Sequence, residues 1–576
     1  MIQPFFINIL REMLIFMKLS IRQTAVVVFT ITFLLYLRTL TCDFVNIDDP
    51  QYVYLNTGIR FFDWSLIVES FTTSYMGWWM PLTWISLAID YRFWGLNPSG
   101  YHLTNALLHA VNASLVVLLA DRVLSGQMLF SCVRDRQKGE VCCFSEHPQF
   151  RESSYGLKYT FTLLLAGLFW GIHPLRVESV AWVTERKDVL SGLFSLLSIL
   201  FYLRYALAKA KEEIKSVLCK DYAFALFFFL LALFAKPVSV VIPAMFLVLD
   251  WFPVGRLRTG TFFTMLAEKI PFVVFAITVA VATVYFAAGE TILISLADYP
   301  LYKRLIVAGY ALTEYARMSI YPFGLVHFYS LPITFSPIHY FFFVISVSVI
   351  SYSVLRYKTF PWLLSTVLLY MLPLLPVLGF LQNGTQSHAD RFSYLPSIFP
   401  SIMAAFFIVV WYERVSSLSR LYGRILFSAL AALLILHGCL TFNLVGAWKN
   451  SGTLWSRLID IRPVGRAYYY RGEYYLKSGQ YPEAIVDLKY SIRQAEITGL
   501  REIYNIHALL GAALSGAGQF DEAVNEFNIA IEMNPIPNYF YYRGLALKGL
   551  GRISEAEDDF KVAGSETGPL GWHVLK

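Results

Sequence analysis

The sequence predicts an all-α protein, in which a polytopic membrane bundle of about eleven helical spans precedes a soluble α-solenoid of tetratricopeptide repeats. Two observations predict this class. Of the 576 residues, 57% are hydrophobic and only 15% are charged, whereas globular domains carry about 25% charged residues. After Pro463 the composition changes to Gly, Ala, Tyr and mixed charge, and the sequence begins to repeat.

The formal net charge of +7 comes from basic residues in short runs between apolar segments. Dispersed charge of this kind is typical of cytoplasmic loops and does not form the continuous patch that a nucleic-acid phosphate footprint needs. Cys132, Cys142 and Cys143 share one basic loop with His147 but lack the C-x-x-C spacing of a zinc site. We therefore expect reduced thiols there, and neither a disulfide framework nor a partner nucleic acid.

Residues 1–22 are expected to be a cytoplasmic N-terminal segment, and Gln23 to Leu40, which lacks a small-residue cleavage site, is expected to stay as the first span. The membrane domain should cover residues 23–447. A span needs about 20 apolar residues, and the candidates are 23–41, 102–121, 157–173, 188–204, 222–236, 237–252, 270–288, 339–355, 361–380, 395–411 and 425–446.

The basic loops at 122–158, 204–220, 256–269, 356–358 and 414–424 fall on one side of these spans and should face the cytoplasm. Residues 303–322 are expected to form an interfacial or re-entrant helix, because a span there would put the last two loops outside. This topology predicts a multi-pass membrane protein, with its polar candidate residues and its repeats on the extracytoplasmic face.

A linker is expected at 448–465, followed by three repeats over 466–571. The copies are Gly472-x-x-Tyr475, Ala484, Leu488; Gly511-x-x-Leu514, Ala523, Phe527, Ala530; and Gly544-x-x-Leu547, Ala556, Phe560, Ala563. Small residues at these offsets let the two helices of a repeat pack closely. Three stacked repeats usually form a concave surface that binds a peptide, although a purely structural cap has the same pattern.

The stretch Asp43-Phe-Val-Asn-Ile-Asp-Asp-Pro50 carries adjacent carboxylates, Asp48 and Asp49, just beyond the first span. Such a pair can serve as a general base for an acceptor hydroxyl, or can help to hold a divalent cation against a phosphate. Two acids that share a site raise one of their pKa values, which suits a base. The alternative is that Asp-Asp-Pro only caps the following helix.

Two short segments concentrate ionisable side chains at a helix junction: His173, Arg176 and Glu178, then Arg186, Lys187 and Asp188. This density is costly beside a bilayer and usually marks a pathway or a site. The cations suit a lipid-linked phosphate; snorkelling at a helix end is the alternative. Further outward-facing candidates are Lys236, Arg317, His388, Asp390 and Arg391, and Asp90 and Asp250 are expected to end helices.

Several motifs carry a family resemblance: Phe44-Val-Asn-Ile-Asp-Asp49, His102-Leu-Thr-Asn-Ala-Leu-Leu-His109, His173-Pro-Leu-Arg-Val-Glu-Ser-Val-Ala-Trp182, Glu185-Arg-Lys-Asp188 and Ala389-Asp-Arg-Phe-Ser-Tyr394. With them the chain resembles bacterial multi-span proteins with C-terminal tetratricopeptide repeats, and the transmembrane and tetratricopeptide-repeat-containing O-mannosyltransferases of animals. Both are C-type glycosyltransferases, and the resemblance to the bacterial proteins implies a location in the bacterial inner membrane. Animal members carry Lys-Glu at the position of Lys236-Pro237, and Gly at the position of Glu185.

The resemblance implies an inverting transfer of a sugar from a polyprenyl-phosphate carrier to a hydroxyl, usually of Ser or Thr, outside the cytoplasm. The family's acidic pair maps onto Asp48 and Asp49, and its His-Pro-x-x-Val-Glu and Arg-x-Asp segments map onto His173, Glu178, Arg186 and Asp188. The expected partners are the lipid-linked sugar, the bilayer and an acceptor protein on the repeats; a divalent cation is the one cofactor considered. Two rivals are a membrane-anchored repeat scaffold and a lipid-linked-sugar transporter.

Overall fold

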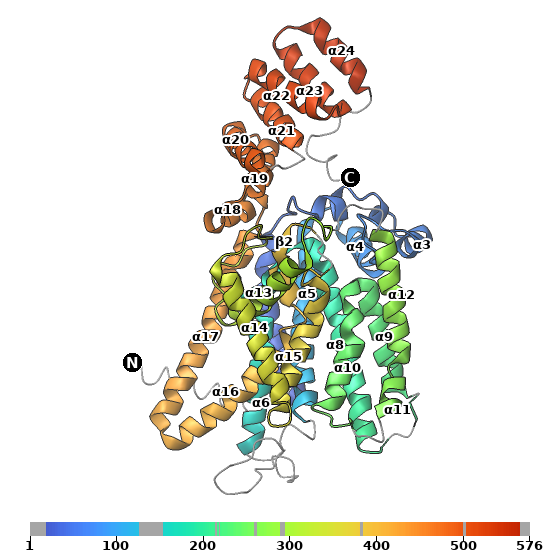
Figure 1. The fold of residues 1–576 in the computed structure, drawn as a ribbon, viewed down its shortest axis with the longest axis vertical. Coiled ribbons are helices and arrows are strands. Elements are labelled where there is room, and N and C mark those ends of the chain that lie inside the picture. The colour runs from blue at the N-terminus through green and yellow to red at the C-terminus, as the bar shows by residue number, and fades with distance from the viewer. Residues whose placement is uncertain are drawn as a thin grey trace. The chain divides into compact units, whose positions relative to one another are not determined.

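The computed structural model describes residues 19–125, 154–213, 216–217, 219–257, 262–287, 294–380, 384–498 and 503–564. The cysteine loop and the first 18 residues lie outside these ranges. The chain divides into two compact units. The membrane unit comprises Met1–Cys42 and Gln51–Gly446, and the repeat unit comprises Asp43–Pro50 and Ala447–Lys576. Figure 1 shows that almost all of the described secondary structure is helical, which confirms the predicted fold class.

Seven helical segments among the described residues are long and apolar enough to cross a membrane. They are α2 with η1 (Ile21–Tyr36, Leu37–Thr41), α5 (Pro98–Leu124), η6 with α8 (Val183–Glu185, Arg186–Ala210), α11 with α12 (Phe262–Ala267, Ile270–Ala287), α14 (Pro337–Leu355), α16 (Ile398–Leu418) and α17 (Arg420–Ala447). An eighth arises if α6 (Ser154–Gly171) and the bent segment after it count as one span. The protein is therefore a multi-pass membrane protein.

The other three expected spans are shorter helices. They are α9 (Lys220–Ala235), η7 with α10 (Pro237–Val241, Ile242–Trp251) and α15 (Pro361–Leu374). Proline ends or begins each of them: Pro237 follows α9, and Pro373 lies near the end of α15. Of the expected interfacial segment 303–322, all but the last two residues lie in α13 (Leu301–Ile320), which carries four charged side chains and is not among the seven.

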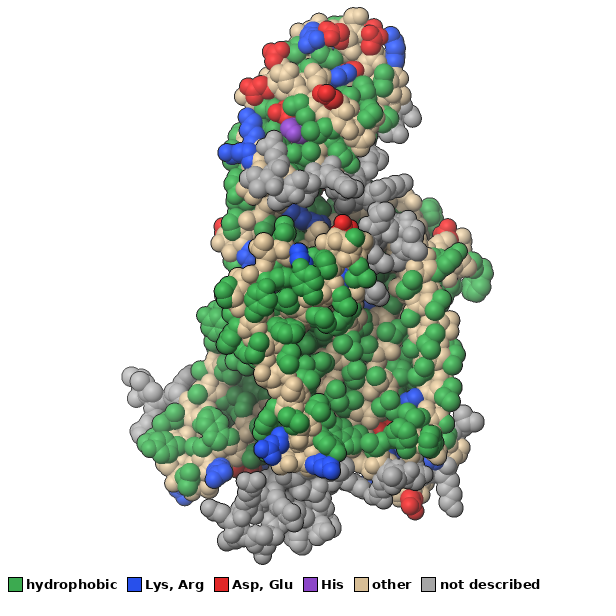
Figure 2. Space-filling view, viewed as in Figure 1, with side chains coloured by type: hydrophobic (Ala, Val, Ile, Leu, Met, Phe, Trp, Pro, Cys, Tyr) green, Lys and Arg blue, Asp and Glu red, His purple; other side chains and the backbone are tan. Residues whose placement is uncertain are grey.

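Helix α5 occupies the centre of the membrane unit and packs against α2, α6 and α8. Its alanines Ala106, Ala110, Ala113 and Ala120 are fully buried. Small residues let neighbouring helices approach closely, which drives helix packing in lipid, where hydrophobicity alone gives no preference for helix contact. By contrast, only 11% of α14 is buried. Figure 2 shows the apolar side chains that cover the flanks of this unit, and the Lys and Arg side chains gathered at its lower end.

Short elements connect the helices near the polar residues: η2 (Pro50–Tyr54), η3 (Gly58–Arg60), α3 (Trp64–Thr72), α4 (Pro81–Trp94), η5 (Pro174–Arg176), α7 (Val177–Ala181), η8 (Leu375–Val377) and η9 (Asp390–Ser393). Strand β1 (Tyr329–Ser330) pairs antiparallel with β2 (Gln386–His388), and Tyr329 lies opposite His388. This pairing leads the chain directly into η9.

The repeat unit contains three helical hairpins: α19 (Gly465–Lys477) with α20 (Tyr481–Thr498), α21 (Ile503–Gly516) with α22 (Phe520–Met533), and α23 (Pro537–Gly549) with α24 (Ile553–Ala563). Their shared core contains Leu488, Leu514 and Phe527. The expected linker at 448–465 instead contains a helix, α18 (Ser451–Ile461). Asn450 caps this helix through Thr453, and its apolar face, including Trp455 and Leu458, is buried.

Candidate active site

The polar centre of the membrane unit is built where α6 ends. Gly171 ends α6, and the chain bends by 51° before continuing through η5 and α7. Pro174 has no N–H to extend a helix, and His173 caps η5 by accepting the Leu175 amide at Nδ1 (3.2 Å). The break turns the backbone inward, so that Arg176, Glu178 and the side chains of the next turns are buried.

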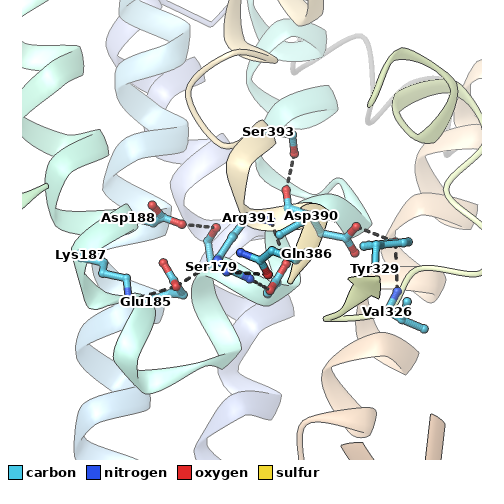
Figure 3. A network of polar contacts seen from close by, with 12 residues as sticks. Ser179, Glu185, Lys187, Asp188, Val326, Tyr329, Gln386, Asp390, Arg391 and Ser393 are labelled. Atoms are coloured by element: carbon cyan, nitrogen blue, oxygen red, sulfur yellow. Dashed lines mark hydrogen bonds and ion pairs between the residues drawn. The ribbon is translucent and has the colours of Figure 1, made fainter. Parts of the chain in front are cut away.

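Glu178 and Arg391 form the first half of an ionic cluster. Figure 3 shows Arg391 in one network of polar contacts with Glu185, Lys187 and Asp188. The Arg391 guanidinium donates from Nη1 to Glu178 Oε1 (2.5 Å), and the Arg391 backbone amide donates to Glu178 Oε2 (2.8 Å). Arg391 Nε lies 3.2 Å from Glu185 Oε1. The residues lie more than 200 positions apart in sequence, so η9 and α7 are fixed to each other by this arginine.

Asp188, Lys236 and Lys187 form the second half. Lys236 donates to Asp188 Oδ1, and its Nζ lies 3.5 Å from Glu185 Oε2. Asp188 Oδ2 accepts the Ser179 hydroxyl (3.1 Å), and Lys187 Nζ lies 3.2 Å from Glu185 Oε1. The cluster thus joins three carboxylates (Glu178, Glu185, Asp188) to three cations (Lys187, Lys236, Arg391). Its formal charge is balanced, as burial of charged groups requires.

Asp390 lies beside this cluster in η9 and binds a different partner. The Tyr329 hydroxyl donates to Asp390 Oδ1 (2.8 Å), and Asp390 is buried. Burial raises the pKa of Asp390 well above its ordinary range, and the nearby Glu178 carboxylate raises the pKa further. The Tyr329 hydrogen bond and the cations Arg176 and Arg391 oppose the rise without reversing it.

A cavity of about 30 Å³ opens against the cluster. Its lining combines the ionic side chains of Asp188, Lys236 and Arg391 with apolar side chains, among them Val238, Pro373, Val377 and Leu395. Ser191, Gly192 and Ser195 of α8 add a face of small residues to the lining. One water needs roughly 10–15 Å³, so the cavity has room for a few waters at most. A larger molecule enters only if the walls separate.

Arg186, a predicted phosphate ligand, is fully occupied inside the bundle. Its guanidinium donates to Asp90 Oδ2 (2.5 Å), Asn105 Oδ1 (2.5 Å), Ser86 Oγ (2.9 Å) and the Tyr101 carbonyl (3.0 Å). Asp90 lies within α4 rather than at its end, which corrects the expectation that it stops the helix. Asp250 does lie at the end of α10, where Arg256 and Lys269 bind it.

The other candidates of the membrane unit divide into neighbours of the cluster and residues with separate partners. Arg176 is buried, donates to Ser393 Oγ (2.5 Å) and faces the Trp170 and Tyr394 rings. His388 stacks on Tyr329 at 4.1 Å between ring centroids. His173 Nε2 meets the Ser319 carbonyl (3.0 Å), and the half-buried Arg317 is paired with the buried Glu314 (2.7 Å) on α13.

Asp48 and Asp49 belong to the repeat unit. Asp49 is buried, and its Oδ2 accepts the Val45 amide (2.9 Å), whereas Asp48 is half-buried at the end of the turn over residues 46–48. Within the described residues, no group of three or more His, Cys, Asp or Glu side chains is arranged to hold a metal ion. A divalent cation held by this pair therefore stays a prediction.

Sequence reasoning missed several partners. Asp90, Tyr329, Ser179 and Gln386 all bind predicted residues directly. Asp90 carried a signal, because a carboxylate inside an apolar helix usually has a cationic partner. Uncharged Tyr329, Ser179 and Gln386 carried none.

Residues 509–567 match the family model described as tetratricopeptide repeat. The chain is 30% identical over 182 residues to the protein O-mannosyl-transferase tmtc2 of Xenopus laevis, covering 30% of this chain and 18% of that protein. It is 30% identical over 185 residues to the protein O-mannosyl-transferase Tmtc1 of Drosophila melanogaster, covering 31% and 18%. It is 33% identical over 162 residues to the human protein O-mannosyl-transferase TMTC4, covering 28% and 18%.

The chain thus spans less than a fifth of the length of these curated relatives. No solved structure matches it. The comparisons establish tetratricopeptide repeats in the C-terminal part and a partial similarity to protein O-mannosyl-transferases.

Proposed function

We propose that the protein is a membrane glycosyltransferase that moves a sugar, of the mannose type, from a polyprenyl-phosphate carrier to a Ser or Thr hydroxyl on the extracytoplasmic face. The observation that carries this proposal is a buried ionic cluster beside a cavity that both charged and apolar side chains line; the cluster consists of Glu178, Glu185, Asp188, Lys187, Lys236 and Arg391. A lipid-linked phosphate likewise combines a charged group with an apolar chain. The partial similarity to protein O-mannosyl-transferases supports the choice of reaction.

Within this proposal, Lys236 and Arg391 bind the phosphate of the donor. Both cations now face carboxylates, so an entering phosphodiester takes the place of Asp188 as the partner of Lys236. Arginine binds phosphate through a planar fork and lysine as a point charge. The small residues Ser191, Gly192 and Ser195 leave room along α8. The carrier chain packs on the apolar side chains of the lining once the cavity widens.

Asp48 takes the proton of the acceptor hydroxyl while the sugar carbon develops oxocarbenium character, as in glycoside chemistry. Of the two aspartates Asp48 is the more exposed, and Asp49 already accepts a loop amide. The repeat unit holds the acceptor and raises its effective concentration. These roles make an inverting, C-type enzyme with its active site on the extracytoplasmic side.

The test uses the purified full chain in lipid nanodiscs, supplied with polyprenyl-phosphate mannose and a Ser/Thr peptide, with products read by mass spectrometry. Asp48→Asn combined with Asp49→Asn should lower kcat at least about 100-fold, because a general base contributes that much. The matched control is Asp63→Asn, since Asp63 caps α3 from an exposed position and asparagine caps equally well. Full activity in the double variant would refute the catalytic role.

Lys236→Met should raise the KM for the donor about 10-fold, because a charge-assisted hydrogen bond is lost. The single variant also strands Asp188, so Lys236→Met with Asp188→Asn serves as the charge-neutral comparison. We expect that pair to regain thermal stability without regaining donor affinity. Recovery of both properties together would show that the Lys236–Asp188 contact is only structural.

A further inference from the structure

The loop that carries the aspartates packs on the first helices of the repeat unit. The Asn46 side chain uses all of its main hydrogen-bonding groups there. Its Nδ2 donates to the Tyr470 carbonyl and to Glu473 Oε2, both at 2.9 Å, and its Oδ1 accepts from Trp455 Nε1 at 2.8 Å. These partners lie more than 400 residues away, on α18 and α19.

The loop backbone is held by the same unit. The Asn46 amide donates to Ser451 Oγ (2.9 Å), and the Asp43 amide donates to the Lys449 carbonyl (2.8 Å). Within the loop, Asp49 Oδ2 accepts the Val45 amide (2.9 Å) and closes the turn on which Asp48 lies. The loop is therefore fixed at its start, at its middle and across its turn.

The partners of Asn46 are themselves rigid. The Trp455 indole stacks on the Tyr470 ring, with centroids 4.7 Å apart and planes 8° from parallel. Glu473 is bound by Lys477 (2.6 Å). Trp455 and Glu473 are 2% and 4% exposed, so the hydrogen bonds of Asn46 are sheltered from water, where loss of one partner costs most.

We propose that Asn46 is a positioning residue that couples the first repeat helix to the carboxylate loop. The position of α19 then sets the position of Asp48, so the repeat unit contributes to the chemical step itself and not only to holding a protein acceptor. This inference rests on the proposed function of Asp48. It goes beyond the view of the repeats as a separate docking surface.

A positioning residue and a docking residue differ in their kinetic effect: loss of the first lowers kcat, and loss of the second raises KM. If Asn46 positions Asp48, Asn46→Ala should lower kcat about 10- to 100-fold, because a displacement of about 1 Å can cost that much. The effect should be equal for a protein acceptor and for a short Ser/Thr peptide, with little change in either KM. Trp455→Phe keeps the ring stack but removes the N–H donor, and should lower kcat in the same sense by a smaller factor.

The matched control is Asn528→Ala. Asn528 lies in the same unit and binds an arginine side chain, Arg543 (2.7 Å), but lies in α22, outside the loop and the two helices that hold it. It should leave kcat on the short peptide unchanged. If Asn46→Ala raises the KM for the protein acceptor while sparing kcat, the positioning role is overturned, because that pattern belongs to a docking surface.

A second pair of variants distinguishes the loss of the Asn46 hydrogen bonds from general misfolding. Asn46→Asp alone sets a carboxylate against Glu473, whereas Asn46→Asp with Glu473→Gln exchanges the amide and the acid between the same two positions. Recovery of kcat in the double variant, relative to the single one, supports the proposal; a double variant no better than the single one overturns it.

Hydrogen exchange at residues 43–50 gives a readout that needs no catalysis. Asn46→Ala should exchange these amides at least about 10-fold faster, and Asn528→Ala should not, because only the first loses loop hydrogen bonds. If the wild type shows no transfer but the exchange difference holds, the proposed function fails and the coupling stands. Unchanged exchange in Asn46→Ala would end the coupling itself.

Discussion

The partner of each buried carboxyl in and beside the cluster influences whether that carboxyl keeps its proton. Glu178, Glu185 and Asp188 face three cations, whereas Asp390 binds only the neutral Tyr329 hydroxyl among the hydrogen bonds described for its side chain. A buried carboxyl with a neutral partner keeps its proton more readily than one with a cationic partner. Asp390 is therefore suited to be a hydrogen-bonding acid.

The stability of the membrane unit should depend on pH through Asp390. Its pKa is raised in the folded protein, by burial first and by Glu178 second, so the folded state binds this proton more tightly than the unfolded state does. The free energy of unfolding should therefore fall as pH rises from about 4, by at most about 1.4 kcal/mol per pH unit. Asp390→Asn should remove this slope, since its amide oxygen can still accept from Tyr329.

Thermal unfolding in nanodiscs between pH 5 and pH 8 measures that slope. Asp390→Ala, which loses the Tyr329 bond at every pH, is the comparison. If Asp390→Asn destabilises the protein most at pH 8, the carboxylate form is the stabilising one and the assigned sign is wrong.

Residue types in the sequence predicted many of the side chains that gather, but not how they pair. His173, Arg176, Glu178, Lys187, Asp188, Lys236, Asp390 and Arg391 lie in one unit, around one break in the chain. Arg186 binds Asp90, 96 positions away, because of the way α4 and α8 pack. No local sequence pattern predicts that packing. The predicted proximity of these residues to Asp48 and Asp49 stays a prediction.

At the scale of elements, the α8 face of Ser191, Gly192 and Ser195 shapes the cavity. A Cβ at Gly192 would meet Tyr394 Cε1 at 2.6 Å. That ring cannot give way easily, because its hydroxyl meets His109 Nδ1 and accepts from Asn112 Nδ2, both at 2.9 Å. Close approach of Tyr394 to α8 thus requires glycine at this position.

Gly192→Ala should therefore destabilise the membrane unit by about 1–3 kcal/mol, the usual effect of overpacking a core, and should lower sugar transfer by displacing Tyr394 into the cavity. The control is Gly438→Ala in α17, where a Cβ meets nothing within 4 Å; alanine there should be neutral or stabilise the helix by up to about 1 kcal/mol. Thermal unfolding and a transfer assay measure both. Equal effects of the two variants would contradict the cavity assignment.

Periodicity and composition predicted most of the elements. The exceptions have physical causes. Proline and short length separate α9, α10 and α15 from the seven longer spans. Helix α18 was mistaken for a linker although Asn450-x-x-Thr453 is a capping signal, because its 11 residues are few for a helix read from sequence alone.

At the scale of the whole molecule, the division into two units does not follow the order of the chain. The segment Asp43–Pro50 interrupts the membrane unit in sequence, yet it is part of the repeat unit. A domain boundary placed at 447 from composition therefore separates residues that fold together. The early aspartates depend for their local structure on residues more than 400 positions later in the sequence.

This division predicts two separable unfolding events in the full chain. Phe527 is fully buried in the repeat core and packs on Gly511, so Phe527→Ala should destabilise the repeat unit by about 3–5 kcal/mol. Hydrogen exchange should accelerate throughout α19 to α24 and also in the loop at 43–50, while α5 and α8 keep their protection. Leu196→Ala, at a fully buried position of α8, is the reciprocal variant and should accelerate exchange in the membrane unit alone. If Phe527→Ala leaves residues 43–50 protected, the aspartate loop does not belong to the repeat unit in solution, and the two-unit organisation is wrong.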